Sequence, residues 1–248
     1  MAQKKAFRGK LDYSNPWYSS SQESWLETGP ARHHNKKRVS YLLSAIERLC
    51  PKNPKILDAG CGDGVLTKYF VRIPGARVVG VDYNPLRLKR ARKNVPNAAF
   101  KAGDLLDLPF KSNSFDVVVA HHVLEHIKDE VTVLRELSRV VKRKGIIIIG
   151  VPNEGSFIAK IRDRVVQRKI LETTDHVNFY DVTSLRRKIE GVRGLKVAET
   201  KAVGGILVPH HGAHMIMIKF RPFYELLHAL AQISPEFADS LFVVARKE

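Results

Sequence analysis

The sequence predicts an α/β fold, doubly wound around a mostly parallel sheet of seven strands. Short apolar runs alternate with segments whose apolar residues recur at helical spacing, and such alternation is typical of a sheet with right-handed crossovers. Residues 115–120 and 146–151 are almost entirely apolar, as expected of parallel strands buried on both faces. Polar residues follow several of these runs directly, at the edge where ligands bind in such sheets.

The first half of the chain predicts three strands. Residues 1–30 lack clear periodicity, and we expect them to form an N-terminal arm that folds over the domain. Val39, Leu42 and Ile46 recur at spacings of three and four, which predicts a helix that ends before two prolines. The elements expected up to Ala102 are helices at 32–49, 65–71 and 84–94 and strands at 55–58, 77–82 and 98–102.

The second half predicts four more strands and a less regular region between them. A long helix is expected to end near Lys144, because Gly145 favours a helix stop. We divide the chain into a cofactor-binding core at 31–152, substrate or lid elements at 153–240 and a last strand within 241–248. The elements expected after Ala102 are strands at 115–120, 146–151, 195–199 and 241–245, a basic amphipathic segment at 156–170, a loop at 175–180 and a helix at 182–190.

A glycine-rich loop after the first strand is the main functional signal. An apolar pair leads into Asp58, and glycines stand at every second position from Gly60 and Gly62 onward, where a ligand can approach the backbone. Asp82 ends the next strand and is placed to bind ribose hydroxyls. A nicotinamide-binding fingerprint would require a third glycine where Val65 stands. An acid at Asp58 would repel a diphosphate but suits a cationic, phosphate-free ligand.

The polar positions after the strands, taken together, resemble the successive motifs of class I S-adenosylmethionine (SAM) dependent methyltransferases. The similar segments are 58–64, 81–82, 103–104, 115–116, 123–126, 139–142 before Gly145, and 176–180. The nearest branch is the ubiquinone-biosynthesis type with its small-molecule relatives. The resemblance covers about residues 32–192 and implies the seven-stranded Rossmann-like fold of that family. Its motifs are specific for the cofactor and not for the substrate.

The resemblance also implies a role for several single residues. Gly60 and Gly62 would pack against the amino-acid part of SAM, and Asp82 would bind the ribose hydroxyls. Tyr83 would flank the adenine. Asp104 would accept a hydrogen bond from the adenine amino group.

Three further residues complete the implied cofactor site. The Leu105 backbone would lie near the adenine, and His121 would lie against the methionine end of SAM. Arg38 matches an arginine that pairs with the methionine carboxylate, although its neighbours Lys36 and Lys37 are equally consistent with a surface cation.

Several histidines follow the fourth strand. His122 or His126 is a candidate general base, because an imidazole titrates near neutrality and can take a proton from an attacking hydroxyl. Together with Glu125 and His176 they also resemble the Glu-x-x-Glu-His plus His magnesium site of small-RNA 2′-O-methyltransferases. His122 stands where that site has a glutamate, and imidazole suits zinc, iron or manganese better than magnesium. Metal binding is therefore left open.

Composition limits the classes of protein. The formal net charge is +17, which would attract nucleic acid, anionic lipid or a phosphorylated substrate, yet the basic clusters are equally consistent with solvated helix faces. The longest apolar run is too short to span a bilayer. Two cysteines form neither a disulfide framework nor a zinc spacing. A cytoplasmic protein is expected, and its oligomeric state is not defined by the sequence.

We therefore expect a SAM-dependent methyltransferase that acts on a small-molecule acceptor, with oxygen as the favoured acceptor atom. One alternative is an RNA 2′-O-methyltransferase, suggested by the charge and the histidines. Another is a lipid or quinone methyltransferase at a membrane surface, because residues 215–230 join apolar side chains to Lys219 and Arg221 as an interfacial helix does. A lid over the substrate pocket is the preferred interpretation of that segment. A SAM-binding protein without catalysis is the last alternative.

Overall fold

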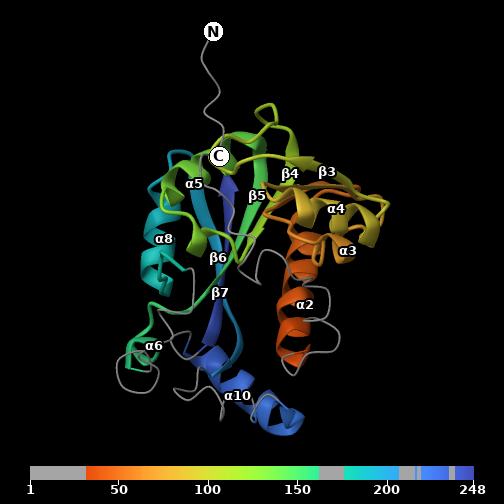
Figure 1. The fold of residues 1–248 in the computed structure, drawn as a ribbon. Coiled ribbons are helices and arrows are strands. Elements are labelled where there is room, and N and C mark those ends of the chain that lie inside the picture. The colour runs from red at the N-terminus through yellow and green to blue at the C-terminus, as the bar shows by residue number, and fades with distance from the viewer. Residues whose placement is uncertain (1–31, 162–175, 207–215, 217–218, 235–237) are drawn as a thin grey trace.

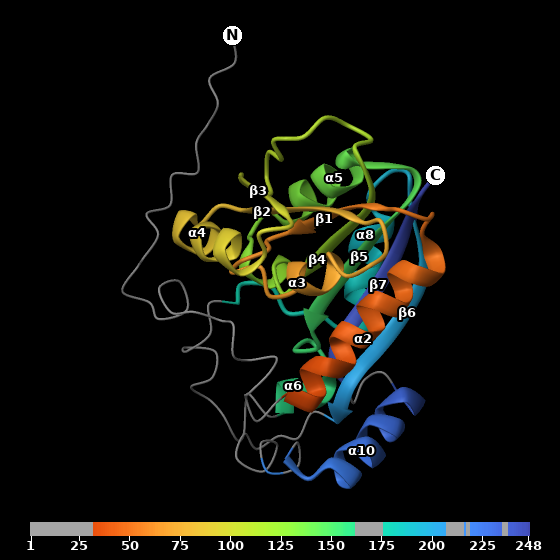
Figure 2. The same ribbon diagram turned by 90° about the vertical axis from the view of Figure 1, so that its right-hand side faces the viewer.

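A computed structural model describes residues 32–161, 176–206, 216, 219–234 and 238–248 of the chain. Seven strands form one sheet in the order β3-β2-β1-β4-β5-β7-β6 (Figures 1 and 2). All neighbouring strands pair in parallel except at β7, which runs antiparallel to both β5 and β6. The strands are β1 (Lys55–Ala59), β2 (Arg77–Asp82), β3 (Ala99–Ala102), β4 (Phe115–His121), β5 (Val141–Pro152), β6 (Leu195–Ile206) and β7 (Ala238–Lys247). The predicted fold class is confirmed.

Helices cover both faces of this sheet. The described α-helices are α2 (Arg32–Leu49), α3 (Thr67–Phe70), α4 (Pro85–Asn94), α5 (Glu130–Val140), α6 (Phe157–Ile161), α8 (Val182–Glu190) and α10 (Arg221–Ile233), and a 3-10 turn, η2, spans Leu124–His126. In Figure 1, α5 and α8 lie on one side of the strands and α2 and α3 on the other. Helix α10 lies at the end of the molecule opposite the C-terminus, where β6 and β7 meet it (Figures 1 and 2).

The core consists of two apolar layers that share the central strands. On β4, Val118 faces the layer under α5 and α8, whereas Val117 and Val119 face the layer under α2 and α3. This alternation follows from the period of two along a strand. Both layers are apolar, so the central strands have no polar face, which explains the continuous apolar runs in the sequence.

The largest error in the predicted elements is at Gly145. Helix α5 ends at Val140, and residues 141–145 already belong to β5. Gly145 is therefore a strand residue, and a Cβ there would lie 2.9 Å from the carbonyl oxygen of Asp116. The pairing of β4 with β5 shifts register between Phe115 and Val117, and this irregularity accommodates Lys144 at a φ of 62°. Periodicity alone does not reveal an irregular strand in which three cations follow the first residue.

The C-terminal strands are longer than predicted. Strand β6 extends seven residues beyond the expected end at 199, and β7 begins at Ala238 and not near 241. The predicted arm at 1–30, much of the basic segment at 156–170 and part of the segment at 215–230 lie outside the described residues. Within the described part of the chain, no helix is long and apolar enough to cross a membrane.

Candidate functional site

The glycine loop after β1 is held in place by Asp82. The backbone N–H of Gly62 donates to Oδ2 of Asp82 at 2.9 Å, and that of Asn84 donates to Oδ1 at 2.8 Å. The backbone N–H of Gly60 donates to the Val81 carbonyl at 2.8 Å. These bonds join the carboxyl ends of β1 and β2, so one carboxylate orders the loop and also lines the cavity beside it.

Gly60 is the position in this loop that requires glycine most clearly. Its φ is 78°, in the left-handed region, and a Cβ would lie 2.5 Å from Cγ2 of Val123. A side chain is therefore excluded both by the backbone conformation and by a neighbour. The loop thus brings bare backbone to the cavity wall.

Asp58 is fully buried beneath the loop. Its Oδ2 accepts a hydrogen bond of 2.6 Å from the hydroxyl of Thr67, the first residue of α3. Burial raises the pKa of Asp58 to about 7, only partly opposed by the Thr67 hydrogen bond. Burial likewise raises the pKa of Asp82, although the Asn84 and Gly62 N–H groups favour its ionised form. A cation in the adjoining cavity would stabilise both carboxylates in that form.

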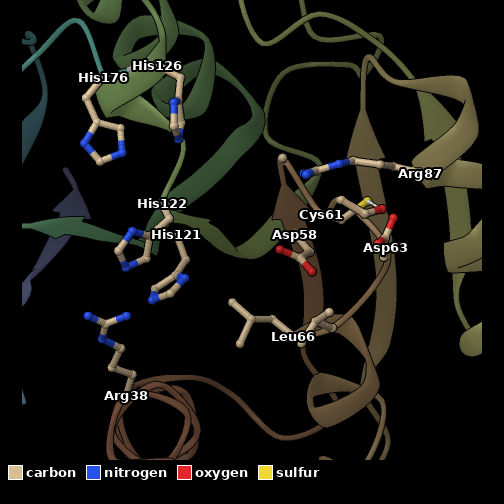
Figure 3. A pocket seen from close by; sticks show the side chains of 13 residues that line it. Arg38, Asp58, Cys61, Asp63, Leu66, Arg87, His121, His122, His126 and His176 are labelled. Carbon is tan, nitrogen blue, oxygen red and sulfur yellow. Dashed lines mark hydrogen bonds between the residues drawn. The ribbon is translucent and has the colours of Figure 1, made fainter. Parts of the chain in front are cut away.

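Two adjoining cavities lie along the carboxyl ends of the strands. One, of about 440 Å³, is lined by Asp82, Tyr83, Asp104 and Leu105, and the other, of about 350 Å³, contains the residues drawn in Figure 3. Residues common to both linings are Gly60, Arg87, His122 and His126. The two cavities therefore meet at the glycine loop and the histidines.

The larger cavity unites five of the predicted cofactor residues, Gly60 and the four named above. Tyr83 is partly exposed, whereas the Leu105 side chain packs into the core below. Oδ1 of Asp104 accepts from the N–H of Leu106 at 2.9 Å, which fixes the carboxylate at the end of β3. The arrangement offers two carboxylates and an aromatic ring around one space.

The smaller cavity unites Arg38, Asp58 and His121 (Figure 3). Arg38 extends from α2 toward the histidines, and its Nη2 lies 3.7 Å from Oδ1 of Asp239. Its Nε is buried and has no hydrogen-bond partner among the described residues. His121 is buried and stacks on Phe242 with ring centroids 5.5 Å apart. Arg38 thus lines a cavity, whereas the sequence was equally consistent with a surface cation at this position.

His122 occupies the junction of the two cavities in a strained conformation. Its φ is 53°, and its N–H donates to the Gly150 carbonyl at 2.8 Å, which fixes the turn after β4. Nδ1 lies 3.0 Å from Oε1 of the fully buried Glu125. Burial lowers the pKa of His122 well below its usual value, so the imidazole is neutral at pH 7 and its Nε2 is available to accept a proton.

A second group of side chains lies beside His122, and we call it the imidazole–carboxylate cluster (Glu125, His126 and His176). One ligand atom from each residue lies within 4.8 Å of the others. Nδ1 of His176 lies 2.6 Å from Oε2 of Glu154, the pairing that orients a metal-binding imidazole through its outer nitrogen. Three nitrogen and oxygen donors suit a zinc-type ion better than magnesium. His122 is not part of this group, in contrast to the four-residue set suggested by the sequence.

Sequence reasoning missed three residues of the site. Arg87, in the first turn of α4, lines both cavities, and its only sequence signal was the basic helix that begins after Asn84. Glu154 pairs with His176, but nothing in its local pattern indicates a partner 22 residues away. Val123 limits the space at Gly60.

Comparisons with known proteins agree with this geometry. Residues 57–149 match the family model described as a methyltransferase domain. An uncharacterised methyltransferase of Schizosaccharomyces pombe is 31% identical over 141 residues, which are 52% of this chain and 49% of that protein. A demethylmenaquinone methyltransferase of Chlorobaculum parvum is 39% identical over 94 residues, 38% of this chain and 39% of the relative. The chain thus spans half or less of the length of these relatives.

Solved structures show the same fold. The crystal structure of a putative sarcosine dimethylglycine methyltransferase from Galdieria sulphuraria superposes with a TM-score of 0.64 at 20% identity, over 88% of each chain. The sheet order and the glycine loop at the carboxyl edge define a Rossmann-like cofactor-binding domain. Within that class, the segment at residues 57–149 is similar to the methyltransferase domain of the class I SAM-dependent enzymes. A relative from Mycolicibacterium smegmatis, 32% identical over 102 residues that are 41% of this chain and 39% of that protein, is named a probable SAM-dependent methyltransferase. Such relatives support the predicted cofactor and enzyme class.

Proposed function

We propose that the protein transfers the methyl group of SAM to a small-molecule acceptor, most readily at an oxygen atom. The observation that carries the proposal is the junction of two cavities at Gly60, His122 and His126. One cavity has acids and an aromatic ring suited to adenosine, and the other has imidazoles. A methyl group held at the junction would lie beside His122 and His126.

The residues of the site fit the proposed cofactor. Gly60 lines both cavities, and Asp82 and Asp104 supply acceptors for ribose and adenine. The buried Nε of Arg38 has no partner among the described residues, so the guanidinium can still receive a carboxylate. SAM supplies a sulfonium-bound methyl group when bound. Asp58 and Asp82 would then offset the positive charge of that ligand.

The proposed chemistry of the protein is alignment assisted by a base. Much of the rate of methyl transfer can come from holding the nucleophile in line with the bond that breaks. Glu125 holds the Nδ1 side of His122 at 3.0 Å, so Nε2 is the atom that would take the acceptor proton. The lowered pKa makes His122 a weaker base than a free imidazole but keeps it unprotonated at neutral pH.

The names of the relatives favour a small acceptor over a macromolecule. A demethylmenaquinone methyltransferase acts, by its name, on a quinone, and it is 39% identical to this chain over 94 residues. RNA is the second candidate, supported by the net charge of +17 and by the histidines after β4. A cytoplasmic location stays a prediction of the sequence.

A methyl-transfer assay separates these candidates. The purified protein would be incubated with methyl-tritiated SAM and with cell extract fractionated into small molecules, lipids, RNA and protein. We expect label in the small-molecule or lipid fraction, at a lower level with His122→Asn. Label in RNA alone would overturn the choice of acceptor, and the absence of label in every fraction would overturn the enzymatic role.

A further inference from the structure

We propose that the outward face of helix α10 is a docking surface for an anionic lipid membrane. The inference is independent of methyl transfer, because binding to lipid vesicles needs neither cofactor nor acceptor. We call this surface the α10 face, and it consists of the exposed side chains at 219–221, 223, 226, 230 and 233.

Exposed apolar side chains concentrate on this face. Among the described residues, twelve large apolar side chains are exposed, and six of them lie between 216 and 233. Their exposed fractions run from 40% at Phe223 to 81% at Ile233. Single exposed apolar residues are ordinary, but a contiguous group marks an interaction surface.

The apolar residues of α10 form one stripe along the helix. Phe223, Leu226, Leu230 and Ile233 follow one another at spacings of three, four and three, which places them on one side. The opposite side packs on the sheet, where Ala231 is buried with Ala202 and Ala238. The fold therefore already satisfies the inner side of α10 and leaves the outer side to solvent.

The charges around the stripe identify the occupant. Lys219 and Arg221 are exposed at its N-terminal end. Glu225 is the only acidic residue between 216 and 234, and it is neutralised by Lys37 of α2 at 2.8 Å. An apolar stripe flanked by cations, on a chain of net charge +17, complements a surface with an apolar interior and anionic headgroups. A purely apolar protein partner would gain nothing from these cations.

Helix α10 lies near residues that line or adjoin the smaller cavity. Lys37, which holds Glu225, precedes Arg38, and Arg38 lines the smaller cavity. Asp239, which lies near Arg38, follows α10 closely in the chain. Figures 1 and 2 both place α10 beside the N-terminal end of α2. Docking through this face would bring α2 and its Arg38 near the lipid.

Vesicle co-sedimentation tests the inference. The whole protein would be mixed with vesicles of phosphatidylcholine and phosphatidylglycerol in equal parts, or with phosphatidylcholine alone. Wild type should sediment with the anionic vesicles, less with the neutral ones, and less at high salt. The double variant Leu226→Glu/Leu230→Glu should bind the anionic vesicles at least roughly tenfold more weakly, because each carboxylate opposes insertion and removes apolar area.

Matched controls keep the test specific. Leu86→Glu/Val131→Glu makes the same change at two exposed apolar positions on α4 and α5, and it should bind about as strongly as wild type apart from the small effect of two added charges. Phe223→Ala/Leu226→Ala preserves helix propensity and charge, so it reports on the face even if the glutamate variant fails to fold, as judged by circular dichroism. Equal loss in the control and α10 variants would overturn the proposal. The proposal would also be overturned if wild type did not sediment with the anionic vesicles. It would be overturned as well if the protein formed a dimer that only the α10 variants dissociate, because the α10 face would then bind a second copy.

Discussion

Asp82→Asn should weaken the binding of SAM and S-adenosylhomocysteine while it also destabilises the glycine loop. The carboxylate accepts two buried backbone hydrogen bonds, of 2.9 and 2.8 Å, from Gly62 and Asn84. An asparagine of the same shape has one acceptor oxygen and must turn its NH₂ group toward the other N–H. Losing one bond to a charged acceptor costs about 1.5–3 kcal/mol of unfolding free energy.

The effect on affinity has a similar size but a separate origin. If the ribose hydroxyls bind the same carboxylate, its neutralisation should cost about 1.5–3 kcal/mol of binding free energy, which is roughly a 10- to 150-fold increase in Kd. Isothermal titration calorimetry with both ligands measures the affinity, and urea unfolding measures the stability. The two measurements distinguish a lost ligand contact from a disordered loop.

Asp116→Asn is the matched control. Asp116 also accepts two hydrogen bonds in the same sheet, from the Lys55 N–H at 2.8 Å and the Lys142 ammonium at 2.7 Å, but it lines neither cavity. The Asp116→Asn variant should therefore unfold at a lower urea concentration but bind SAM and S-adenosylhomocysteine as tightly as wild type. If Asp82→Asn binds both ligands as tightly as wild type, or if NAD binds in their place, the assignment of this carboxylate to the cofactor is refuted.

Three further predictions concern the same site. Gly60→Ala should lower the free energy of unfolding by roughly 1–3 kcal/mol, because alanine is strained at the left-handed φ and its Cβ would contact Val123. The double variant Gly60→Ala/Val123→Ala should recover only the part of this loss that comes from the contact, as measured by urea unfolding. Burial raises the pKa of Asp58 to about 7, so a bound cationic ligand should displace up to one proton from this carboxyl, and SAM affinity should rise as pH increases through about 7. Calorimetry in buffers of different ionisation enthalpy measures the protons released on binding. Release of no proton by wild type, or of equally many by Asp58→Asn, would contradict this prediction. Asparagine tolerates the positive φ at position 122, so His122→Asn should lower turnover with little change in Kd for SAM. The turnover of wild type should survive EDTA. Loss of wild-type activity on chelation, with stoichiometric metal in wild type but not in His176→Ala, would instead assign a metal to the imidazole–carboxylate cluster.

The regular elements were the most predictable part of the fold. Helix α8 and strand β2 have the predicted bounds, and α4 begins as expected because Asn84 accepts hydrogen bonds from the N–H groups of Leu86 and Arg87. These signals are local: a cap, a proline or an apolar period. The start of β5 depends instead on its pairing with β4 around an irregularity, and no local pattern records that pairing.

The site was predictable to a similar extent. Residues that directly follow strands were brought together as expected, because parallel strands end at one edge of the sheet. The contact of His176 with Glu154, and the position of Arg87 over the glycine loop, depend on how loops and a helix pack across that edge. Such contacts join segments whose sequences give no sign of one another.

The antiparallel strand β7 has a consequence for synthesis of the protein. Strand β7 lies between β5 and β6. The backbone N–H and C=O groups along one edge of β5 therefore have no strand partner until residues 238–247 have left the ribosome. A nascent chain that already contains the complete glycine loop would still expose a strongly apolar strand edge, which other chains can pair with. Translation that stalls before Ala238 should therefore yield aggregates and not a smaller working domain.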